Sequence, residues 1–524
     1  MARVILTDNL NNLSDWVGRL FEADAGANID THTKGTFAFT YSNGQSFAGY
    51  TVTIKGAGFQ YFHGDPVGGT MKSVVVADAQ GQTVITIDQI AAKGLASDLS
   101  QFVSDIFGAR TATGDGPNPS GPAAWSHILS GNDTIIGSNG NDRQGLPETN
   151  GGNDVFNMGD GDDRIAGSSG SDAIFGGNGY DQLTFKETTY ETGYTAFQGI
   201  NLDVTAGKLT DCWGFVDHFT SIESFEGSRF NDVFKGSDGR DEFSGLRGRD
   251  AFYGGGGSND SVVYDNDYWQ GGNYGITVDL QKSLVNGSIH GTIRDGFGQL
   301  DQTYDIERVT GTRFNDVFVG STENNQFSGG EGKDFYNGDA GFDTVNFGRT
   351  FTDAAMVGIV VDLSKAKGQI INDGFFNTET AKSIEAISGS WLDDKIKGNG
   401  QSNYIEGGDG KDTMTGGGGN DYFGYYDSFD FGDGDVITDF KSSGAAGNID
   451  VLEFGSADFA GMTTTLHLVN GAAATEAVGS FVFKAANHTL YWDEDGTGAA
   501  AMVSVATLNG VTSLTADNIH LELG

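Results

Sequence analysis

The stretch Gly407-Gly408-Asp409-Gly410-Lys411-Asp412-Thr413-Met414-Thr415 decides the fold of this chain, because its pattern returns every nine residues in four blocks. Glycine at the first, second and fourth positions permits the left-handed and close-approach backbone of a tight turn. The last three residues are expected to form a short strand whose middle side chain points inward. A strict nine-residue period of this kind is typical of a parallel β-roll, with two units in each coil.

The sixth position of each unit carries a side chain with a hard oxygen ligand. Calcium takes roughly 6–8 oxygens in loose geometry, and stacked turns can supply them from carboxylates and backbone carbonyls. We therefore predict several calcium ions, placed between successive turns on each edge of the coil. A flexible Gly/Asp-rich segment without metal is the alternative, and the strict phase argues against it. The predicted calcium ligands are Asp133, Asp142, Asp154, Asp163, Asp172, Asp181, Asp232, Asp241, Asp250, Asp316, Asn325, Asp334, Asp343, Asp394, Asn403, Asp412, Asp421 and Asp430.

The composition of the 524-residue chain is strongly acidic. Asp and Glu total 71 against 30 Lys and Arg, which gives a formal net charge of -41. Stacked carboxylates repel one another, so the metal-free repeats should be loose or unfolded. The same charge argues against nucleic acid and anionic lipid as direct partners. The 37 phenylalanines exceed what a solvating, disordered chain carries.

Four regions follow from the pattern along the chain. Residues 1–110 are expected to form a small α+β docking or assembly domain, and residues 111–127 a Pro/Gly linker. Residues 128–430 would form the β-roll with its spacer coils, and residues 431–524 a β-rich C-terminal cap. Within the first region the pattern predicts helices over 13–21 and 90–107, and strands over 36–42, 50–55, 73–77 and 82–87.

A longer repeat lies above the nonapeptide. Ser228–Phe234 recurs as Thr312–Phe318, with a weaker copy at Ser390–Ile396. Each copy follows a strand pattern, and an Ile-Glu pair lies nearby, as at Ile222-Glu223. These spacers are predicted to continue the solenoid as wider coils.

The number of cysteines and the distribution of apolar residues indicate where the protein is located. Cys212 is the only cysteine, so an intramolecular disulfide is impossible and a buried apolar role is expected. The stretch Met1–Asp8 has too short an apolar run for a cleaved signal peptide and no small-residue cleavage site follows it, and no transmembrane segment is predicted. Calcium sites of millimolar affinity would be empty in a cytosol, which favours an extracellular location.

The chain from residue 128 to 524 resembles the RTX (repeats-in-toxin) family through its nonapeptides. The segments Gly432–Phe454, Leu490–Gly496 and Val511–Ala516 are similar to the C-terminal region of serralysin-type secreted proteins. The resemblance implies export by a type I secretion system that reads an uncleaved C-terminal signal. It also implies that each sixth-position Asp binds calcium together with backbone carbonyls at the glycines.

Some units depart from the family pattern. Asn325 and Asn403 replace Asp and should make weaker, less charged sites. Gly131 and Gly227–Phe230 depart in glycine content, so the first unit of each block is a weaker match. The segment Asp493-Glu494-Asp495-Gly496 fits either a further calcium loop or a hairpin turn.

No catalytic motif is found: the chain has no His-Glu-x-x-His and no Gly-x-Ser-x-Gly. The leading hypothesis is therefore a secreted calcium-binding structural protein of a surface layer or extracellular matrix, not an enzyme. Its expected partners are further copies of itself or a cell-surface glycan or lipopolysaccharide. The alternative is a secreted enzyme or adhesin that acts on polysaccharide through Tyr264, Asp265, Asp267, Tyr268 and Trp269.

Overall fold

The fold is described from a computed structural model of the chain, which forms two compact units, residues 1–260 and 261–524. The described residues are 3–6, 27–32, 36–41, 51–62, 65–77, 83–88, 132, 134–137, 140–144, 152–186, 196–257, 259–285, 288–348, 357–426, 434–443, 449–455 and 465–522.

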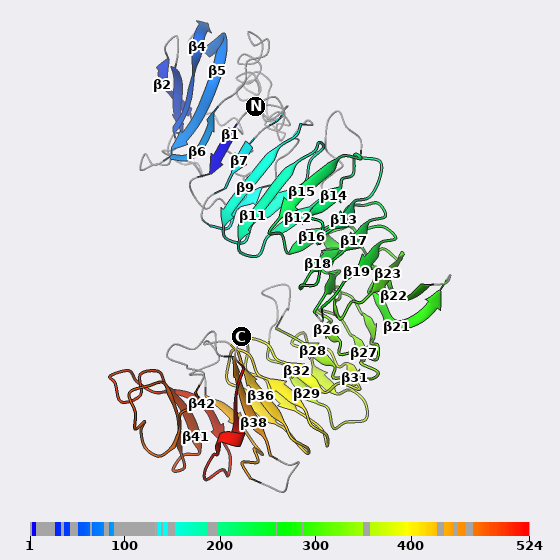
Figure 1. The fold of residues 1–524 in the computed structure, drawn as a ribbon, viewed down its shortest axis with the longest axis vertical. Coiled ribbons are helices and arrows are strands. Elements are labelled where there is room, and N and C mark those ends of the chain that lie inside the picture. The colour runs from blue at the N-terminus through cyan, green and yellow to red at the C-terminus, as the bar shows by residue number, and fades with distance from the viewer. Residues whose placement is uncertain are drawn as a thin grey trace. The chain divides into compact units, whose positions relative to one another are not determined.

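The first unit begins with an antiparallel sheet of β-branched and aromatic segments, shown in blue in Figure 1. The strands follow the order β2, β3, β4, β5, β6, β1, and β1 then pairs in parallel with the first strand of the roll, β7. The four strands predicted in this region overlap β3 to β6, although β4 extends to Phe62 and β5 begins at Asp65, and β1 and β2 were not predicted. The two predicted helices and the linker lie outside the described residues. The bounds are β1 (Arg3–Leu6), β2 (Ala27–His32), β3 (Thr36–Tyr41), β4 (Thr51–Phe62), β5 (Asp65–Ala77) and β6 (Thr83–Asp88).

The rest of the first unit is a roll of two parallel sheets. In one sheet β7, β9, β11 and β15 pair in turn, and β13, β17 and β19 continue the pattern. In the other, β8, β10, β12, β16 and β18 pair in turn. The bounds are β7 (Thr134–Ile136), β8 (Arg143–Gln144), β9 (Val155–Asp160), β10 (Arg164–Ala166), β11 (Ala173–Asn178), β12 (Gln182–Thr184), β13 (Asn201–Asp203), β14 (Lys208–Thr210), β15 (Val216–Thr220), β16 (Ser224–Glu226), β17 (Val233–Lys235), β18 (Glu242–Ser244) and β19 (Ala251–Tyr253).

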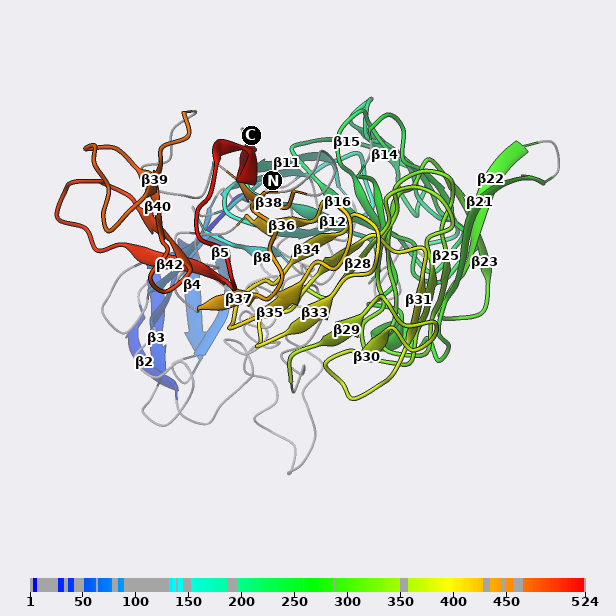
Figure 2. The same ribbon diagram turned by 90° about the horizontal axis from the view of Figure 1, so that it is seen from below.

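The second unit repeats the arrangement. One parallel sheet runs β20, β24, β26, β28, β32, β34, β36, β38, β43, and facing strands run β21, β25, β27, β31 and β29, β33, β35, β37, β42 (Figure 2). The bounds are β20 (Ser261–Val263), η2 (Tyr268–Gln270), β21 (Thr277–Val285), β22 (Ser288–Arg294), β23 (Leu300–Tyr304), β24 (Arg308–Thr310), β25 (Val317–Val319), β26 (Gln326–Ser328), β27 (Phe335–Asn337), β28 (Thr344–Asn346), β29 (Val360–Asp362), β30 (Ile370–Asn372), β31 (Thr380–Lys382), β32 (Ala386–Ser388), β33 (Lys395–Lys397), β34 (Tyr404–Glu406), β35 (Thr413–Thr415), β36 (Tyr422–Tyr425), β37 (Asp435–Ile437), β38 (Val451–Gly455), β39 (Leu468–Asn470), β40 (Ser480–Lys484), β41 (Thr489–Asp493), β42 (Val503–Leu508), η4 (Ala516–Asn518) and β43 (Ile519–Glu522).

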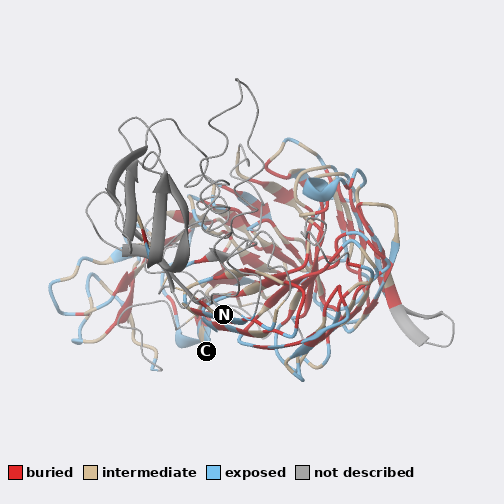
Figure 3. Ribbon diagram, turned by 90° about the horizontal axis from the view of Figure 1, so that it is seen from above, coloured by how far each residue is buried: buried red, intermediate tan, exposed pale blue. Residues whose placement is uncertain are grey.

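Each three-residue strand sends its middle side chain into the core between the sheets, so buried strand segments alternate with exposed turns in Figure 3. Residues 18 apart stack in register, as Phe234 does on Phe252 with ring centroids 5.1 Å apart. Phe318 stacks on Tyr336 in the same way at 5.2 Å. The expected mainly-β parallel roll is confirmed.

Three spacers interrupt the short coils, each as an antiparallel hairpin followed by a returning strand: β13–β15, β21–β23 and β29–β31. β15 returns to the parallel ladder beside β11, and β31 returns beside β27. The first spacer also buries Cys212, as predicted. In the C-terminal cap β40, β41 and β42 form an antiparallel meander, so Asp493–Gly496 begins a hairpin connection.

Candidate metal centres

The sixth-position side chains are held by hydrogen bonds that run from coil to coil. The Asp181 Oδ1 atom accepts the N–H of Asp163 at 2.8 Å, and the Asp412 Oδ1 atom accepts that of Asp394 at 2.7 Å. The strand that follows each turn fixes this register, because its backbone pairs in parallel with the strand 18 residues away. The same bond joins Asp154 to Asp172, Asp232 to Asp250, Asp316 to Asp334, Asn325 to Asp343 and Asn403 to Asp421.

One class of turn leaves the second carboxylate oxygen without a donor. In the turn before Asp412, Gly408 (φ 84°) and Gly410 (φ 109°) adopt left-handed conformations that side-chain-bearing residues rarely reach. The Asp412 side chain is buried, and its Oδ2 atom accepts no hydrogen bond from any described residue. We name these the open turns; the Oδ2 atom is orphaned in this way at Asp163, Asp181, Asp343, Asp412 and Asp421.

Burial of these carboxylates makes their charged form costly. Loss of hydration raises the pKa of Asp412 to about 9, and the negative charges of Asp435 and Asp394 add to the effect. Desolvation likewise raises the pKa of Asp163 and of Asp343 to about 7. A buried oxygen of this kind requires a proton or a cation. The turns therefore fit calcium, which would supply the missing positive charge.

A second class of turn satisfies its own carboxylate, and we name these the closed turns. Asp232 Oδ2 accepts the N–H of Ser228 at 2.8 Å, and its Oδ1 accepts the Ser228 hydroxyl at 2.9 Å and the Ile200 N–H at 2.6 Å. Both carboxylate oxygens are thus occupied. Thr312 donates its N–H and hydroxyl to Asp316 in the same way, and Ser390 donates both groups to Asp394. In three further turns the second-position residue donates its N–H to the sixth-position side chain: Ser237 to Asp241, Ser321 to Asn325 and Asn399 to Asn403.

Several acidic residues outside the predicted set take the sixth-position role. Asp435 and Asp450 of the cap accept the N–H groups of Asp412 and Asp421, at 2.9 and 3.1 Å. Glu223 and Glu385, from the spacer Ile-Glu pairs, accept those of Asp181 and Asp343 at 2.9 and 3.0 Å. A sequence signal for them exists: each acid stands two residues before the inward-pointing residue of a strand, as in Asp435-Val436-Ile437.

The remaining predicted ligands are also placed. Asp142, Asp154, Asp172, Asp250 and Asp334 are buried, whereas Asp133 and Asp430 lie outside the described residues. Within the described ranges, no three Asp, Glu, His or Cys side chains converge as they would in a site built from side chains alone. A calcium ion here would therefore take part of its ligands from backbone carbonyls. No helix among the described residues is long and apolar enough to cross a membrane.

Comparisons with known proteins agree with the repeat. The family model described as the RTX calcium-binding nonapeptide repeat (4 copies) matches residues 129–143, 148–183, 226–260, 310–345 and 388–423. Repeats of this family bind multiple calcium ions. No curated protein matches the chain. The crystal structure of the extracellular lipase LipA from Serratia marcescens is similar at 13% identity over 95% of this chain and 86% of that chain, with a TM-score of 0.24, which assigns no activity here.

Proposed function

We propose that this chain, which carries RTX calcium-binding nonapeptide repeats, is secreted and folds on calcium outside the cell as a structural component of a surface layer or matrix. The observation that carries this proposal is the set of buried, orphaned carboxylate oxygens in the open turns. Asp163, Asp181, Asp343, Asp412 and Asp421 would hold the ions with backbone carbonyls of their turns. When bound, calcium supplies positive charge that joins neighbouring coils.

Charge links calcium to assembly. At a formal net charge of -41 the metal-free chains repel one another, and bound calcium lowers that repulsion. In the first unit, strand β1 covers the edge of β7 at the start of the roll. A truncated chain lacking β1 would expose that strand edge and could associate for an artificial reason. The full chain is therefore the proper material for an assembly test.

The test is the assembly state of the full-length protein at millimolar calcium. We expect regular sheets or filaments by electron microscopy and a large rise in light scattering. The same chain with chelator, or with equimolar magnesium, which prefers stricter octahedral geometry, is expected to stay small. A calcium-folded protein that remains monomeric at high concentration would reject the structural role and favour the binding role described next.

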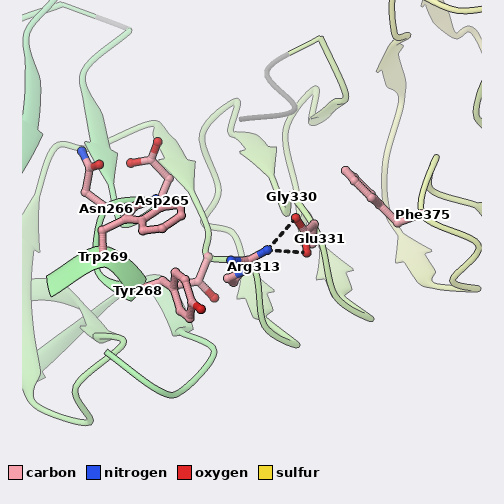
Figure 4. Close-up of a pocket in the computed structure, with 9 residues that line it drawn as sticks. Asp265, Asn266, Tyr268, Trp269, Arg313, Gly330, Glu331 and Phe375 are labelled. Atoms are coloured by element: carbon pink, nitrogen blue, oxygen red, sulfur yellow. Dashed lines mark hydrogen bonds and ion pairs between the residues drawn. The ribbon is translucent and has the colours of Figure 1, made fainter. Parts of the chain in front are cut away.

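A specific hollow in the second unit supports a second candidate function, the binding of a cell-surface saccharide. It is lined by Asp265, Asn266, Tyr268, Trp269, Thr312, Arg313, Gly330, Glu331 and Phe375 (Figure 4). Trp269 is 68% exposed, and the guanidinium of Arg313 lies 4.4 Å from the centroid of the Tyr268 ring. Arg313 donates to both Glu331 carboxylate oxygens, at 3.0 and 3.1 Å. Exposed rings beside fixed polar groups suit a sugar, which has apolar faces and hydroxyl edges.

The hollow also corrects the residues expected for polysaccharide contact. Asp265, Tyr268 and Trp269 do line it, but Tyr264 and Asp267 are buried and do not. The Tyr264 hydroxyl donates to the buried Asp301 at 2.9 Å, which uses its polar end inside the fold. Sequence alone could not separate these residues, because all five fall within one short segment.

Affinity electrophoresis of the calcium-loaded protein in gels that contain isolated cell-surface polysaccharide tests the saccharide role. Trp269→Ala is expected to abolish the mobility shift if Trp269 stacks on a sugar. Phe376→Ala is the matched control, since Phe376 is 65% exposed but does not line the hollow. Equal retardation of all three proteins would exclude the hollow as the binding site.

A further inference from the structure

All three spacers contain an acidic segment that lies outside the matched nonapeptides. The pattern is Asp-x-aromatic-x-x-x-acid, and the first Asp accepts two backbone N–H groups through its Oδ1 atom. In the first spacer Asp211 accepts those of Trp213 and Phe215, at 2.9 and 2.7 Å. The three segments are Asp211-Cys212-Trp213-Gly214-Phe215-Val216-Asp217, Asp295-Gly296-Phe297-Gly298-Gln299-Leu300-Asp301 and Asp373-Gly374-Phe375-Phe376-Asn377-Thr378-Glu379.

In the first spacer both acids of the segment converge on one nonapeptide turn. Asp217 Oδ1 accepts the N–H of Asp172 at 2.8 Å, and the Asp211 carboxylate accepts the N–H of Gly170. Asp217 thereby takes the place of the sixth-position residue of the next coil. Residues Asp211 and Asp217 are both fully buried.

Three buried oxygens around this turn have no hydrogen-bond partner among the residues that the structure describes. They are the Oδ2 atoms of Asp211 and Asp217 and the hydroxyl of Ser169, which directly precedes Gly170. Two buried carboxylates and one hydroxyl, all with an unused oxygen, form a set of hard ligands for a divalent cation. Burial removes water from the Asp217 carboxyl group, and the nearby negative charges of Asp172 and Asp211 further disfavour its charged form. A bound cation would offset both effects.

We propose that the first spacer binds an additional calcium ion through Asp211 and Asp217, with the Ser169 hydroxyl and backbone carbonyls as further ligands. The ion would continue the row of calcium sites through a coil that lacks the nonapeptide. This inference rests on calcium binding by the roll and is independent of assembly or saccharide binding.

The other two spacers show parts of the same arrangement. In the third, Glu379 Oε1 accepts the N–H of Asp334 at 3.0 Å, and its Oε2 atom is buried without a partner among the described residues. However, Asp373 Oδ2 accepts the side-chain amide of Asn377 at 2.9 Å, which occupies one potential ligand atom. The first spacer is therefore the one to test.

The decisive measurement is the number of calcium ions retained by the full-length protein, from equilibrium dialysis with radioactive calcium. Asp217→Asn is expected to lower that number by one. The matched control is Asp203→Asn in the same spacer, where the Asp203 side chain accepts the N–H of Ala206 in the hairpin turn. The control is expected to retain the full number.

Terbium luminescence supplies a second measurement that does not depend on an acid substitution. Trp213 is two residues from Asp211 and its backbone N–H donates to that carboxylate, so we expect its indole to sensitise a terbium ion bound there. Trp213→Phe is expected to reduce the sensitised emission while the number of bound ions stays constant. If Asp217→Asn does not fold, this variant and Asp217→Glu, which copies Glu379, carry the test.

Other outcomes would overturn the proposal. A full ion count in Asp217→Asn, together with greater stability of that variant in chelator, would mean that the two acids share a proton and hold no metal. Unchanged terbium emission in Trp213→Phe would also reject the site. If the wild-type protein retained no calcium in the dialysis, the calcium-dependent function itself would be refuted. Failure of the additional site and failure of the proposed function are therefore distinguishable.

Discussion

Substitution of Gly408 by alanine tests whether the left-handed turn is what builds a calcium centre. Gly408 occupies the second position of the Asp412 turn with φ 84°. A Cβ atom there would overlap the backbone oxygen of Ser390 in the preceding coil. The substitution therefore strains its own backbone and also pushes two stacked coils apart.

The expected cost has two parts. A left-handed conformation costs an L-residue roughly 1–2 kcal/mol. Displacement of a buried backbone carbonyl adds a similar amount, so the loss of folding free energy should total about 2–4 kcal/mol. With a urea m-value of about 2 kcal/mol/M, the unfolding midpoint in saturating calcium should fall by about 1–2 M.

Gly400→Ala is the matched control, since Gly400 has no left-handed φ and open space around its Cβ position. It should leave the midpoint unchanged or raise it slightly, because alanine restricts the unfolded chain by about 0.4–1 kcal/mol. Urea titrations followed by circular dichroism measure both variants. Equal midpoints for Gly408→Ala and wild type would refute the assignment of the turn conformation.

Further expectations follow from the same turns. Addition of millimolar calcium to the full chain in chelator should produce a large gain of β signal in circular dichroism, and identical spectra would refute calcium-dependent folding. In chelator, protonation of Asp163 and Asp412 favours the fold, because their folded pKa values of about 7 and 9 lie above the ordinary value of 3.8. This stabilisation is complete below pH 3.8, falls as the pH rises above that value, and is fully lost once the pH has passed the folded pKa values of about 7 and 9. Circular dichroism should therefore show more β structure at pH 5 than at pH 9, and the reverse order would contradict the sign. Asp412→Asn should raise the calcium midpoint of folding more than Asp394→Asn, because Ser390 already donates two hydrogen bonds to the Asp394 carboxylate. Equal midpoints would show that open and closed turns do not differ in calcium binding. Deletion of roughly the last 60 residues should retain the protein inside the producing cell, by immunoblot of cells and medium, whereas normal secretion would refute a C-terminal signal.

The architecture of the roll was predictable because it depends on local, periodic chemistry. The nine-residue period fixes where turns and three-residue strands alternate, and the inward side chains such as Phe318 follow from the strand phase. The distinction between open and closed turns also depends on the local sequence. Serine or threonine at the second position, as at Ser228, supplies a hydroxyl donor that glycine lacks.

Other features depended on three-dimensional contacts that spacing alone does not reveal. Asp435 and Asp450 follow their partners by 23 and 29 residues, so they fall outside the nine-residue phase. Asp217 pairs with Asp172 across 45 residues, because a hairpin intervenes. In each case the parallel ladder, which forms only in the folded chain, brings the acid into register.

The coil-to-coil hydrogen bond gives the solenoid a direction. In the second unit the N–H of Asp394 is received by Asp412, and the N–H of Asp412 by Asp435 of the cap. In these described turns each coil donates to the coil that follows it in sequence, and Asp435 of the cap accepts the last of these bonds without a nonapeptide after it. We therefore expect a substitution near the cap to weaken the coils that precede it, whereas a substitution at the amino-terminal end of the roll should affect mainly that end.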